Sequence, residues 1–228
     1  MAPTEKLLSA CTLRSIDKLF KTRELSSLPS LDEWMAQPAD MSELEEQILL
    51  RYQKGLAFNV HDWNEYELDT HFIGPVFSLA DFSSPYFNHF GQRDIDAMVD
   101  STLLYGRVDG MIASGRREPE LPYFAFQEYK RNLDPNGDPA GQCLAAMLVG
   151  QSLGPDTTLP LYGCYVVGRD WYFLTLEGRN YAITKGHNAL DTDELLDIFR
   201  LLRALRQFVA QRVATQLNEP LVLCGQSY

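Results

Sequence analysis

The sequence predicts an α/β fold, because strand-like and helix-like segments alternate along most of its 228 residues. Apolar runs rich in aromatic and β-branched residues, which favour strands, occur at residues 103–113, 123–130 and 160–176. Segments with leucine and alanine at helical spacing lie around them, at residues 43–59, 139–153 and 191–215. With 45% hydrophobic residues, the chain can bury a core of the size that one domain with an appendage requires.

The first 58 residues are expected to form a helical extension. Residues 4–22 carry leucine, isoleucine and phenylalanine at roughly helical spacing, which predicts one or two short helices. A further amphipathic piece is expected at residues 31–35. Ser42 and Glu45 stand three residues apart and form a capping box, so a long helix is expected from there to about residue 59. We expect this extension to provide packing or a dimer surface, with nucleic-acid recognition as the alternative.

A helix is expected to open the second region, which spans residues 59–215. Asp62 is placed to cap this helix, and its apolar positions continue to about residue 79. Gly74 and Pro75 lie inside the stretch. Because proline removes one helical hydrogen bond, we expect a bend at this pair.

Two strands carry acidic side chains and a lysine. A hairpin over residues 92–113 places Asp109 inside an apolar run. The strand at 123–130 holds Glu128 and Lys130, and residues two apart in a strand project from the same face. Two carboxylates and a lysine at one sheet edge predict a site for a hard cation such as Mg²⁺, which takes oxygen ligands and keeps several waters. The lysine would position or deprotonate an attacking water, or balance charge in the transition state.

A helix is expected after this strand. Residues 134–139 are dense in turn formers, with Asp138 suited to the N-cap and Pro139 to the first helical position. The alanine- and leucine-rich stretch to residue 153 predicts a helix buried against the sheet, with Gln142 in its first turn.

The remaining elements are expected to complete the domain. Two strands joined at Gly168 and a short third strand are expected at 160–167, 171–176 and 180–184. An amphipathic helix is expected at 191–215. The tail, residues 216–228, receives no assignment.

At these residues the chain resembles the PD-(D/E)XK, or restriction-endonuclease-like, phosphodiesterases. The residues that carry the resemblance are Asp109-Gly110, Glu128-Tyr129-Lys130 and Gln142. Val108 stands where the family has a proline. The resemblance covers roughly residues 60–210 and implies a restriction-endonuclease-like mixed β-sheet with helices on both faces.

The resemblance also implies roles for individual residues. Its implied catalytic residues are Asp109, Glu128, Lys130 and Gln142, with Lys130 positioning the attacking water and the Gln142 amide reaching the metal cluster or a phosphate. Its implied ligands for Mg²⁺ or Mn²⁺ are Asp109, Glu128, the main-chain carbonyl of Tyr129, and Glu65. Glu65 stands ten residues before Pro75, as in the nuclease part of type I restriction subunits, while Glu67 is the alternative on another helical face.

The overall charge is the main observation against a nuclease. A net charge of −11 disfavours nonspecific coating of nucleic acid, because phosphate contacts need lysine and arginine. A local basic rim would compensate, and the arginines expected to bind substrate are Arg107, Arg116, Arg117 and Arg131. A partner protein that supplies the binding surface is the other solution.

Other classes of site and location are not indicated. The four cysteines and four histidines show no zinc-ligand spacing. No apolar run is long enough to cross a bilayer and no signal-peptide core is present, so a cytoplasmic protein without a membrane partner is expected.

The sequence therefore predicts a nuclease that uses Mg²⁺ or Mn²⁺ to hydrolyse DNA, with RNA as the alternative, through an Asp...Glu-X-Lys site. A homodimer is expected, because one such site cuts one strand. Two rival interpretations remain. One is a non-catalytic interaction protein that keeps the fold and binds a partner through its acidic surface. The other is an effector nuclease active only with a partner in a defence or restriction system.

Overall fold

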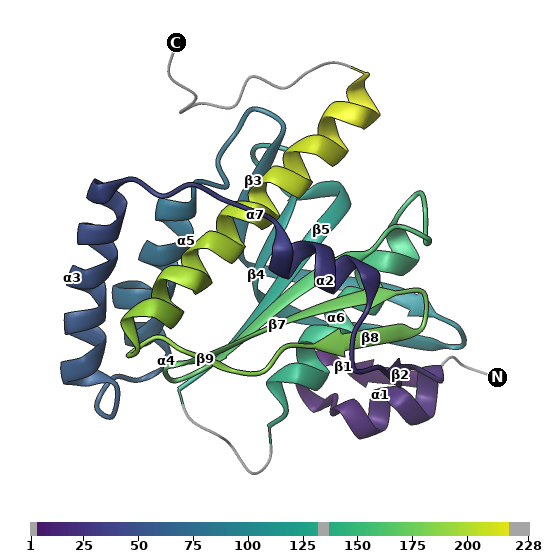
Figure 1. Ribbon diagram of the computed structural model, residues 1–228. Helices are drawn as coiled ribbons and strands as arrows, with labels where there is room; N and C mark the ends of the chain where they lie inside the picture. The colour runs from purple at the N-terminus through teal and green to yellow at the C-terminus, as the bar shows by residue number, and fades with distance from the viewer. Residues whose placement is uncertain (1–3, 132–136, 219–228) are drawn as a thin grey trace.

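A single mixed sheet organises the chain (Figure 1). Within residues 4–131 and 137–218, the parts that the computed structural model describes, the sheet has nine strands. Its main path runs β1-β4-β5-β6-β7-β8-β2, while β3 pairs with β4 and β9 pairs with β7. Helices cover both faces of this sheet, so the α/β class with a mixed sheet flanked by helices is confirmed.

The centre of the sheet is an antiparallel meander followed by a parallel crossover. The strands β3 (Phe87–Val99), β4 (Thr102–Ser114) and β5 (Glu120–Lys130) pair antiparallel in chain order. Helix α6 (Pro139–Leu153) then returns the chain so that β6 (Leu161–Val167) pairs parallel to β5. A parallel neighbour requires such a crossover, which explains why the alanine-rich helix lies between the two strands. β3 begins five residues before the expected start at residue 92.

The outer strands come from both ends of the chain. β7 (Asp170–Glu177) and β8 (Asn180–Ile183) continue the sheet antiparallel, and β9 (His187–Asn188) pairs with β7. β1 (Thr4–Leu7) pairs parallel with β4, and β2 (Arg23–Glu24) pairs parallel with β8. The expectation of only helices over residues 4–22 is therefore wrong at its start, because pairing with β4 overrides the helical spacing of the leucines.

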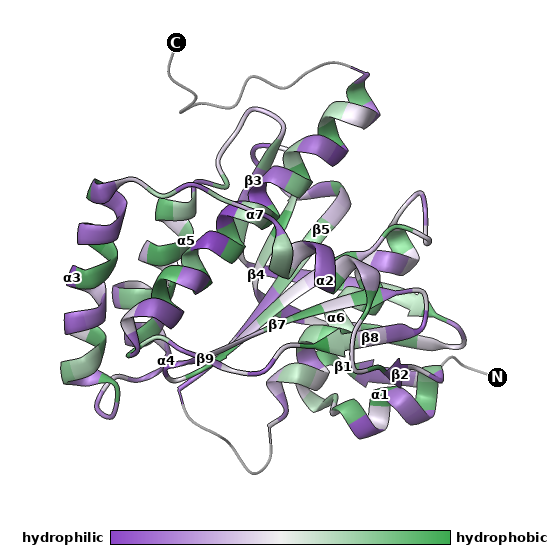
Figure 2. Ribbon diagram, in the orientation of Figure 1, coloured by the Kyte–Doolittle hydropathy of each residue, from purple (hydrophilic) through white to green (hydrophobic). Residues whose placement is uncertain are grey.

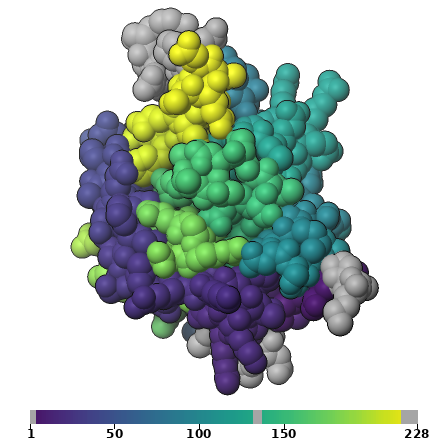
Figure 3. All heavy atoms as spheres, turned by 90° about the vertical axis from the view of Figure 1, so that its right-hand side faces the viewer, coloured from purple at the N-terminus to yellow at the C-terminus, as the bar shows by residue number. Residues whose placement is uncertain are grey.

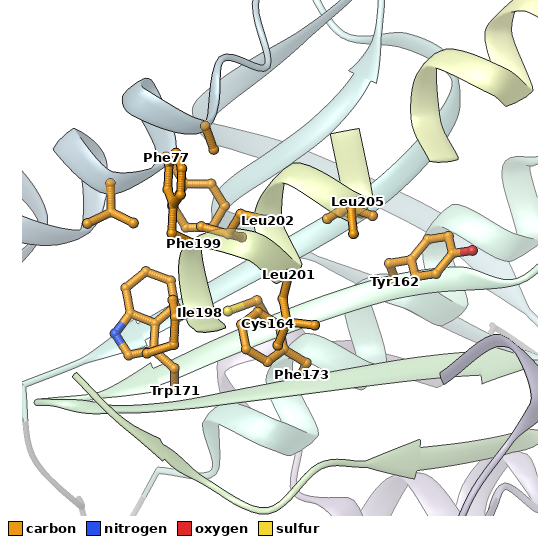
Figure 4. Packing of buried hydrophobic residues seen from close by; sticks show 14 of the residues in the cluster. Phe77, Tyr162, Cys164, Trp171, Phe173, Ile198, Phe199, Leu201, Leu202 and Leu205 are labelled. Carbon is orange, nitrogen blue, oxygen red and sulfur yellow. The ribbon is translucent and has the colours of Figure 1, made fainter. Parts of the chain in front are cut away.

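Two groups of helices fill the two faces of the sheet. The first core lies under α2 (Pro29–Ala36), α3 (Glu43–Asn59), α5 (Gly74–Ala80) and α7 (Thr192–Leu217). Its centre combines Phe77, Trp171 and Phe199, as Figure 4 shows. The second core lies under α1 (Leu13–Phe20) and α6. The turns of α7 alternate between hydrophobic and hydrophilic in Figure 2, in keeping with its one buried face.

The segment that precedes β3 is a continuous helix with an irregular middle. It consists of α4 (Glu65–Leu68), a π-helical stretch (Asp69–Ile73) and α5. Asn64, rather than Asp62, caps it, because its side chain accepts a hydrogen bond from the Glu67 N–H at 2.9 Å. Where the sequence predicts a bend at the Gly74-Pro75 pair, the structure has this wider π turn just before the pair, in which the Gly74 N–H bonds to the Asp69 carbonyl.

The N-terminal segment is connected to the start of α6. Asp138 caps α6 through the Gly141 N–H at 2.9 Å, and its other oxygen accepts the Leu13 N–H at 2.8 Å. In Figure 3 the N-terminal segment covers the lower part of the surface and the end of α7 lies at the top. The predicted boundaries at residues 58 and 215 fall inside the last turns of α3 and α7. Most of the predicted tail lies outside the described residues, as does the first half of the turn at 134–139.

Candidate metal centre

The meander brings Asp109 and Glu128 together. The antiparallel ladder between β4 and β5 ends with Gly110 opposite Gln127, and Asp109 and Glu128 are the residues just beyond that pair. Asp109 is held in place by an unusual bond for a strand residue, because its Oδ2 accepts the main-chain N–H of Tyr129 at 2.8 Å. Two carboxylates from sequence positions 19 residues apart thus share one end of the central strands.

Lys130 completes the cluster together with Glu65. The Lys130 Nζ lies 2.8 Å from Glu128 Oε1 and 3.6 Å from Glu65 Oε1. It also donates a hydrogen bond to the main-chain carbonyl of Tyr129 at 2.8 Å. Glu65 reaches the end of β5 because it opens α4, whereas the Glu67 carboxylate turns back and accepts the Asn64 N–H at 2.8 Å. Of the two acidic residues that the sequence leaves open, the structure places Glu65 beside the lysine.

Burial and mutual repulsion raise the pKa values of these carboxyl groups. Burial first, and then the charge of Asp109, raise the pKa of Glu128 to about 7, although Lys130 opposes the shift. Burial also raises the pKa of Asp109, against the opposing effects of the Tyr129 N–H and Lys130. The pKa of Glu65 is raised as well, by burial, while Lys130 opposes it. Burial lowers the pKa of Lys130, but the surrounding carboxylates raise it more, so the ammonium form is favoured. Three carboxyl groups thus surround one ammonium group, and the raised pKa values show that their ionised forms are disfavoured at this spacing and burial.

The donors of this cluster fit a hard divalent cation. The Asp109, Glu128 and Glu65 carboxylates and the Tyr129 carbonyl are all oxygens, which Mg²⁺ and Mn²⁺ prefer. Among the described residues, no three His, Cys, Asp or Glu side chains already form a metal-binding group. The ammonium of Lys130 bonds to two of the four donor groups and lies near a third, so a cation would have to displace it from those oxygens.

Gln142 lies in the first turn of α6, where the sequence predicts it. The residue is buried, and its neighbour Cys143 lies against β5, with Sγ 3.5 Å from the Phe126 carbonyl. The side chains of Phe126 and Glu128 share a face of β5 by alternation. Within residues 4–131 and 137–218, no hydrogen bond joins the Gln142 amide to the carboxylates. The structure thus places Gln142 near this side of the sheet without a contact to the cluster.

The predicted arginine rim is only partly beside the cluster. Arg131 follows Lys130 directly, and its Nη2 donates to the His61 carbonyl at 3.2 Å. Arg107 is engaged by Asp94 on β3 through two bonds of 2.9 Å. Arg116 and Arg117 follow the far end of β4, on the order of 20 Å along the strand from Asp109. The structure does not bring these last two arginines together with the cluster.

Asp69 is a further acidic residue near the cluster, and it lies outside the motif residues that the sequence predicts. It lies one helical turn after Glu65, at the start of the π-helical stretch. Burial and the charge of Asp109 raise its pKa. The signal that would have revealed it is the spacing of four residues from Glu65, which places both carboxylates on one side of the helix.

The buried side chains of His89 and Gln127 form a polar layer next to the carboxylates. His89 on β3 shares a hydrogen bond of 3.0 Å with the Gln127 side chain, and its ring stacks on Phe77 at 5.0 Å. Burial lowers the pKa of His89, which favours the neutral ring, although the hydrogen bond to Gln127 opposes the shift. Gly110 provides the space for this layer, because a Cβ there would lie 2.2 Å from Gln127 Oε1. His89 and Gln127 are 38 residues apart, and no sequence pattern joins them.

A separate hollow lies away from the cluster. A cavity of about 670 Å³ is lined by the end of α2, the segment after β8 and the start of α7, including Met35, Lys185, His187 and Arg200. None of the cluster residues lines it, so it is a separate feature from the candidate metal centre.

Comparisons with known proteins add no assignment. No model of a protein family matches the chain, and no curated protein matches it either. The described helices include none that combines the length and the apolar character needed to span a membrane.

Proposed function

We propose that the protein is a Mg²⁺- or Mn²⁺-dependent phosphodiesterase of the PD-(D/E)XK kind that hydrolyses nucleic acid. One observation carries the proposal: Lys130 stands between Glu128 and Glu65 and beside the Tyr129 carbonyl, while Asp109 lies next to Glu128 on the adjacent strand. The order of β3, β4, β5, α6 and β6, with β6 parallel to β5, supports the restriction-endonuclease-like arrangement that the resemblance implies.

Asp109, Glu128 and the Tyr129 carbonyl would hold the cation, with Glu65 as a further ligand. When bound, the cation would polarise the scissile phosphate and lower the pKa of a bound water. The excess of carboxylates over ammonium groups in the cluster favours cation binding, since a divalent ion relieves their repulsion.

The side chains of this chain would carry the remaining steps. The hydrogen bond from the Tyr129 N–H to Oδ2 fixes the orientation of the Asp109 carboxylate. Its other oxygen, Oδ1, is therefore held in one position and is available to a cation. Lys130, once it leaves the carboxylates, donates hydrogen bonds to the attacking water and the phosphate oxygen, and so places the water in line with the leaving oxygen. The water oxygen would form the new P–O bond while the bond to the leaving oxygen breaks; the water gives up a proton to solvent, and the leaving oxygen takes one up from solvent.

The substrate class follows from this chemistry and from the nearby charges. Arg131 stands at the end of β5, next to Lys130, where a phosphate on either side of the scissile bond would pass. DNA is the first substrate that we propose, with RNA as the alternative.

The direct test is a cleavage assay on purified protein. Single- and double-stranded DNA and RNA are incubated with Mg²⁺ or Mn²⁺, and with EDTA in the control. We expect cleavage only with the metal ion, and loss of cleavage in Asp109→Asn. A matched control is Lys18→Ala, which removes an exposed lysine on α1 and should leave cleavage unchanged.

A second candidate function is a non-catalytic interaction protein. The net charge of −11 favours it, because an acidic surface repels phosphate and suits a basic protein partner. A third is a nuclease that requires such a partner. Silence of the purified protein with every substrate and metal ion favours the second candidate, whereas cutting on reconstitution with a partner identifies the third.

A further inference from the structure

The hairpin formed by β3 and β4 carries apolar side chains next to one another on its outer face. Met98 on β3 pairs with Leu103 on β4, and two residues further along Asp96 pairs with Tyr105. Residues directly opposite each other in an antiparallel pair project from the same face of the sheet. Met98 exposes 44% of its surface, while Leu103 and Tyr105 are half-buried. These four side chains therefore lie together on the side of the hairpin that faces solvent.

Strand β1 extends the same face. Its residues Glu5 and Leu7 pair with Leu103 and Tyr105, so their side chains lie beside those two residues. Leu7 exposes 45% of its surface, and Glu5 is exposed as well. Two distant parts of the chain thus bring together a set of residues that we call the outer patch, which consists of Leu7, Met98, Leu103 and Tyr105 with the carboxylates Glu5 and Asp96.

The opposite face of these three strands is covered by the fold. The second core, under α1 and α6, buries Leu8, Ile95, Ala97, Val99 and Leu104. An antiparallel sheet with one face on the core and one face in water commonly carries polar residues on the wet face. The outer patch departs from this pattern, because most of its side chains are apolar or aromatic. A contiguous apolar surface with polar residues at its rim marks an interaction site.

The charges of the outer patch select the kind of partner. Asp94, next to the patch, is neutralised by Arg107 through two bonds of 2.9 Å. Asp96 and Glu5, in contrast, form no ion pair within the described parts of the chain. A second copy would bring its own carboxylates against them, and a nucleic acid would bring phosphates, so both occupants are repelled. A protein surface with lysine or arginine around an apolar centre complements the patch, and the net charge of −11 acts in the same direction.

We propose that the outer patch is the docking surface for a basic protein partner, whose lysine or arginine side chains pair with Asp96 and Glu5 around an apolar contact with Met98. This inference goes beyond the proposed function and does not depend on it. The outer patch contains none of the residues of the candidate metal centre, so variants of the patch leave the carboxylate cluster intact.

The test uses three short peptides as probes of the partner's chemistry. Acetyl-KLKYKLK-amide combines basic and apolar side chains, acetyl-KSKSKSK-amide keeps the charge without the apolar side chains, and acetyl-ELEYELE-amide reverses the charge. Each peptide is titrated into ¹⁵N-labelled protein, and the amide chemical shifts are followed by NMR. We expect KLKYKLK to shift the amides of the outer patch and its direct neighbours, KSKSKSK to do so far more weakly, and ELEYELE to leave them unchanged.

Two substitutions separate the apolar contact from the acidic one. Met98→Ser removes the exposed thioether and Asp96→Lys reverses a charge, and each should weaken binding of KLKYKLK roughly tenfold, as loss of one central interface contact does. Leu44→Ser on α3 and Glu33→Lys on α2 make matching changes at exposed positions elsewhere, and they should leave the affinity unchanged. Circular dichroism of each variant checks that the fold is kept.

Four outcomes overturn the inference. The first is that KLKYKLK shifts no amide of the outer patch. The second is that KLKYKLK and KSKSKSK cause shifts of equal size, which means attraction by charge alone. The third is that both Met98→Ser and Asp96→Lys bind KLKYKLK as the wild type does, which places the peptide elsewhere. The fourth is a wild-type dimer, measured by analytical ultracentrifugation, that dissociates in Met98→Ser, which identifies the patch as a contact between two copies.

Discussion

The ammonium nitrogen of Lys130 lies 2.8 Å from Oε1 of Glu128, and it bonds at the same distance to the carbonyl of Tyr129. These two oxygens are proposed ligands of the divalent cation. The lysine and a cation would therefore compete for the same acceptors, and binding of the cation would release Lys130 toward the substrate. Under the proposed function, the lysine and the carboxylates can thus be tested separately, the lysine for cleavage and the carboxylates for metal binding.

Substitution of Lys130 should reduce cleavage without reducing metal affinity. Lys130→Ala is expected to lower the cleavage rate at least 100-fold, the lower end of what one positioned proton donor contributes. Mn²⁺ affinity should stay the same or increase, because the competing ammonium is absent. Isothermal titration calorimetry and a single-turnover cleavage assay measure the two effects. Undiminished metal-dependent cleavage by this variant, with a normal circular dichroism spectrum, would falsify the assigned role.

Metal binding should stabilise the protein. A ligand that binds only the folded state at 100 times its Kd adds about 2.7 kcal/mol to the free energy of unfolding. We expect millimolar Mg²⁺ or Mn²⁺ to raise Tm in differential scanning fluorimetry, and Asp109→Asn to reduce the increase. K⁺ at matched ionic strength is the control for screening. An equal Tm increase in K⁺, or none in any metal ion, contradicts a specific site.

The pKa of Glu128 predicts a pH dependence of stability in EDTA. Its pKa is about 7 in the folded protein, mainly because of burial, against 4.5 for the unperturbed group. The folded state thus holds the proton more strongly, so the free energy of unfolding should fall as pH rises from about 4.5 to 7, by on the order of 3 kcal/mol. Glu128→Gln cannot ionise and should remove this decrease. Urea unfolding at pH 5 and pH 8 measures it, and the same loss in both proteins would mean that another group is responsible.

The two glutamates of α4 form a matched pair. Glu65 faces Lys130, whereas Glu67 accepts the Asn64 N–H as part of a capping box. Glu65→Gln should weaken Mg²⁺ binding and slow cleavage, while Glu67→Gln should leave both unchanged and keep the stability close to that of the wild type, because glutamine can also accept the Asn64 N–H in a capping box. Urea unfolding and Mg²⁺ titration of both variants test the assignment. It is reversed if Glu67→Gln proves to be the variant that loses metal affinity.

The space at Gly110 should be essential to the support behind the carboxylates. A Cβ at this position would lie 2.8 Å from His89 Nε2 and closer still to Gln127, so Gly110→Ala should destabilise the fold by about 1–3 kcal/mol. Gly91, its partner on β3, is the control, because a Cβ there would meet only the Asp109 carbonyl at 3.8 Å. Thermal unfolding compares the two. Equal stability of Gly110→Ala and Gly91→Ala would show that the buried polar layer tolerates the added methyl group.

The sequence predicts those parts of the fold that depend on local pattern. Apolar runs rich in aromatic and β-branched residues identify β4 and β5, and the Asp138-Pro139 pair marks the start of α6. The strand β1 is missed because its pairing with β4 depends on residues about 100 positions later, which no local pattern contains.

The candidate site, too, is predictable only where it depends on local pattern. The spacing of Glu128 and Lys130 on one strand can be recognised in the sequence, and so can Asp109 on the preceding strand. The choice of Glu65 over Glu67 depends on where α4 docks, and the engagement of Arg107 by Asp94 depends on cross-strand register. Such contacts are decided by tertiary packing and cannot be read from one strand or helix alone.

Asp138 also has a consequence for any shortened version of this protein. The Asp138 carboxylate accepts hydrogen bonds from the first turns of two helices, α1 and α6. The two helices also approach closely at Gly141, where a Cβ would lie 2.5 Å from the Thr12 and Leu13 backbone, so their relative position is fixed. Trimming the first twenty residues would strip the partner from one oxygen of that carboxylate and uncover the buried side of the crossover helix. The first twenty residues are thus part of the folded core. Truncating them would destabilise α6, the helix that follows the Glu-X-Lys strand.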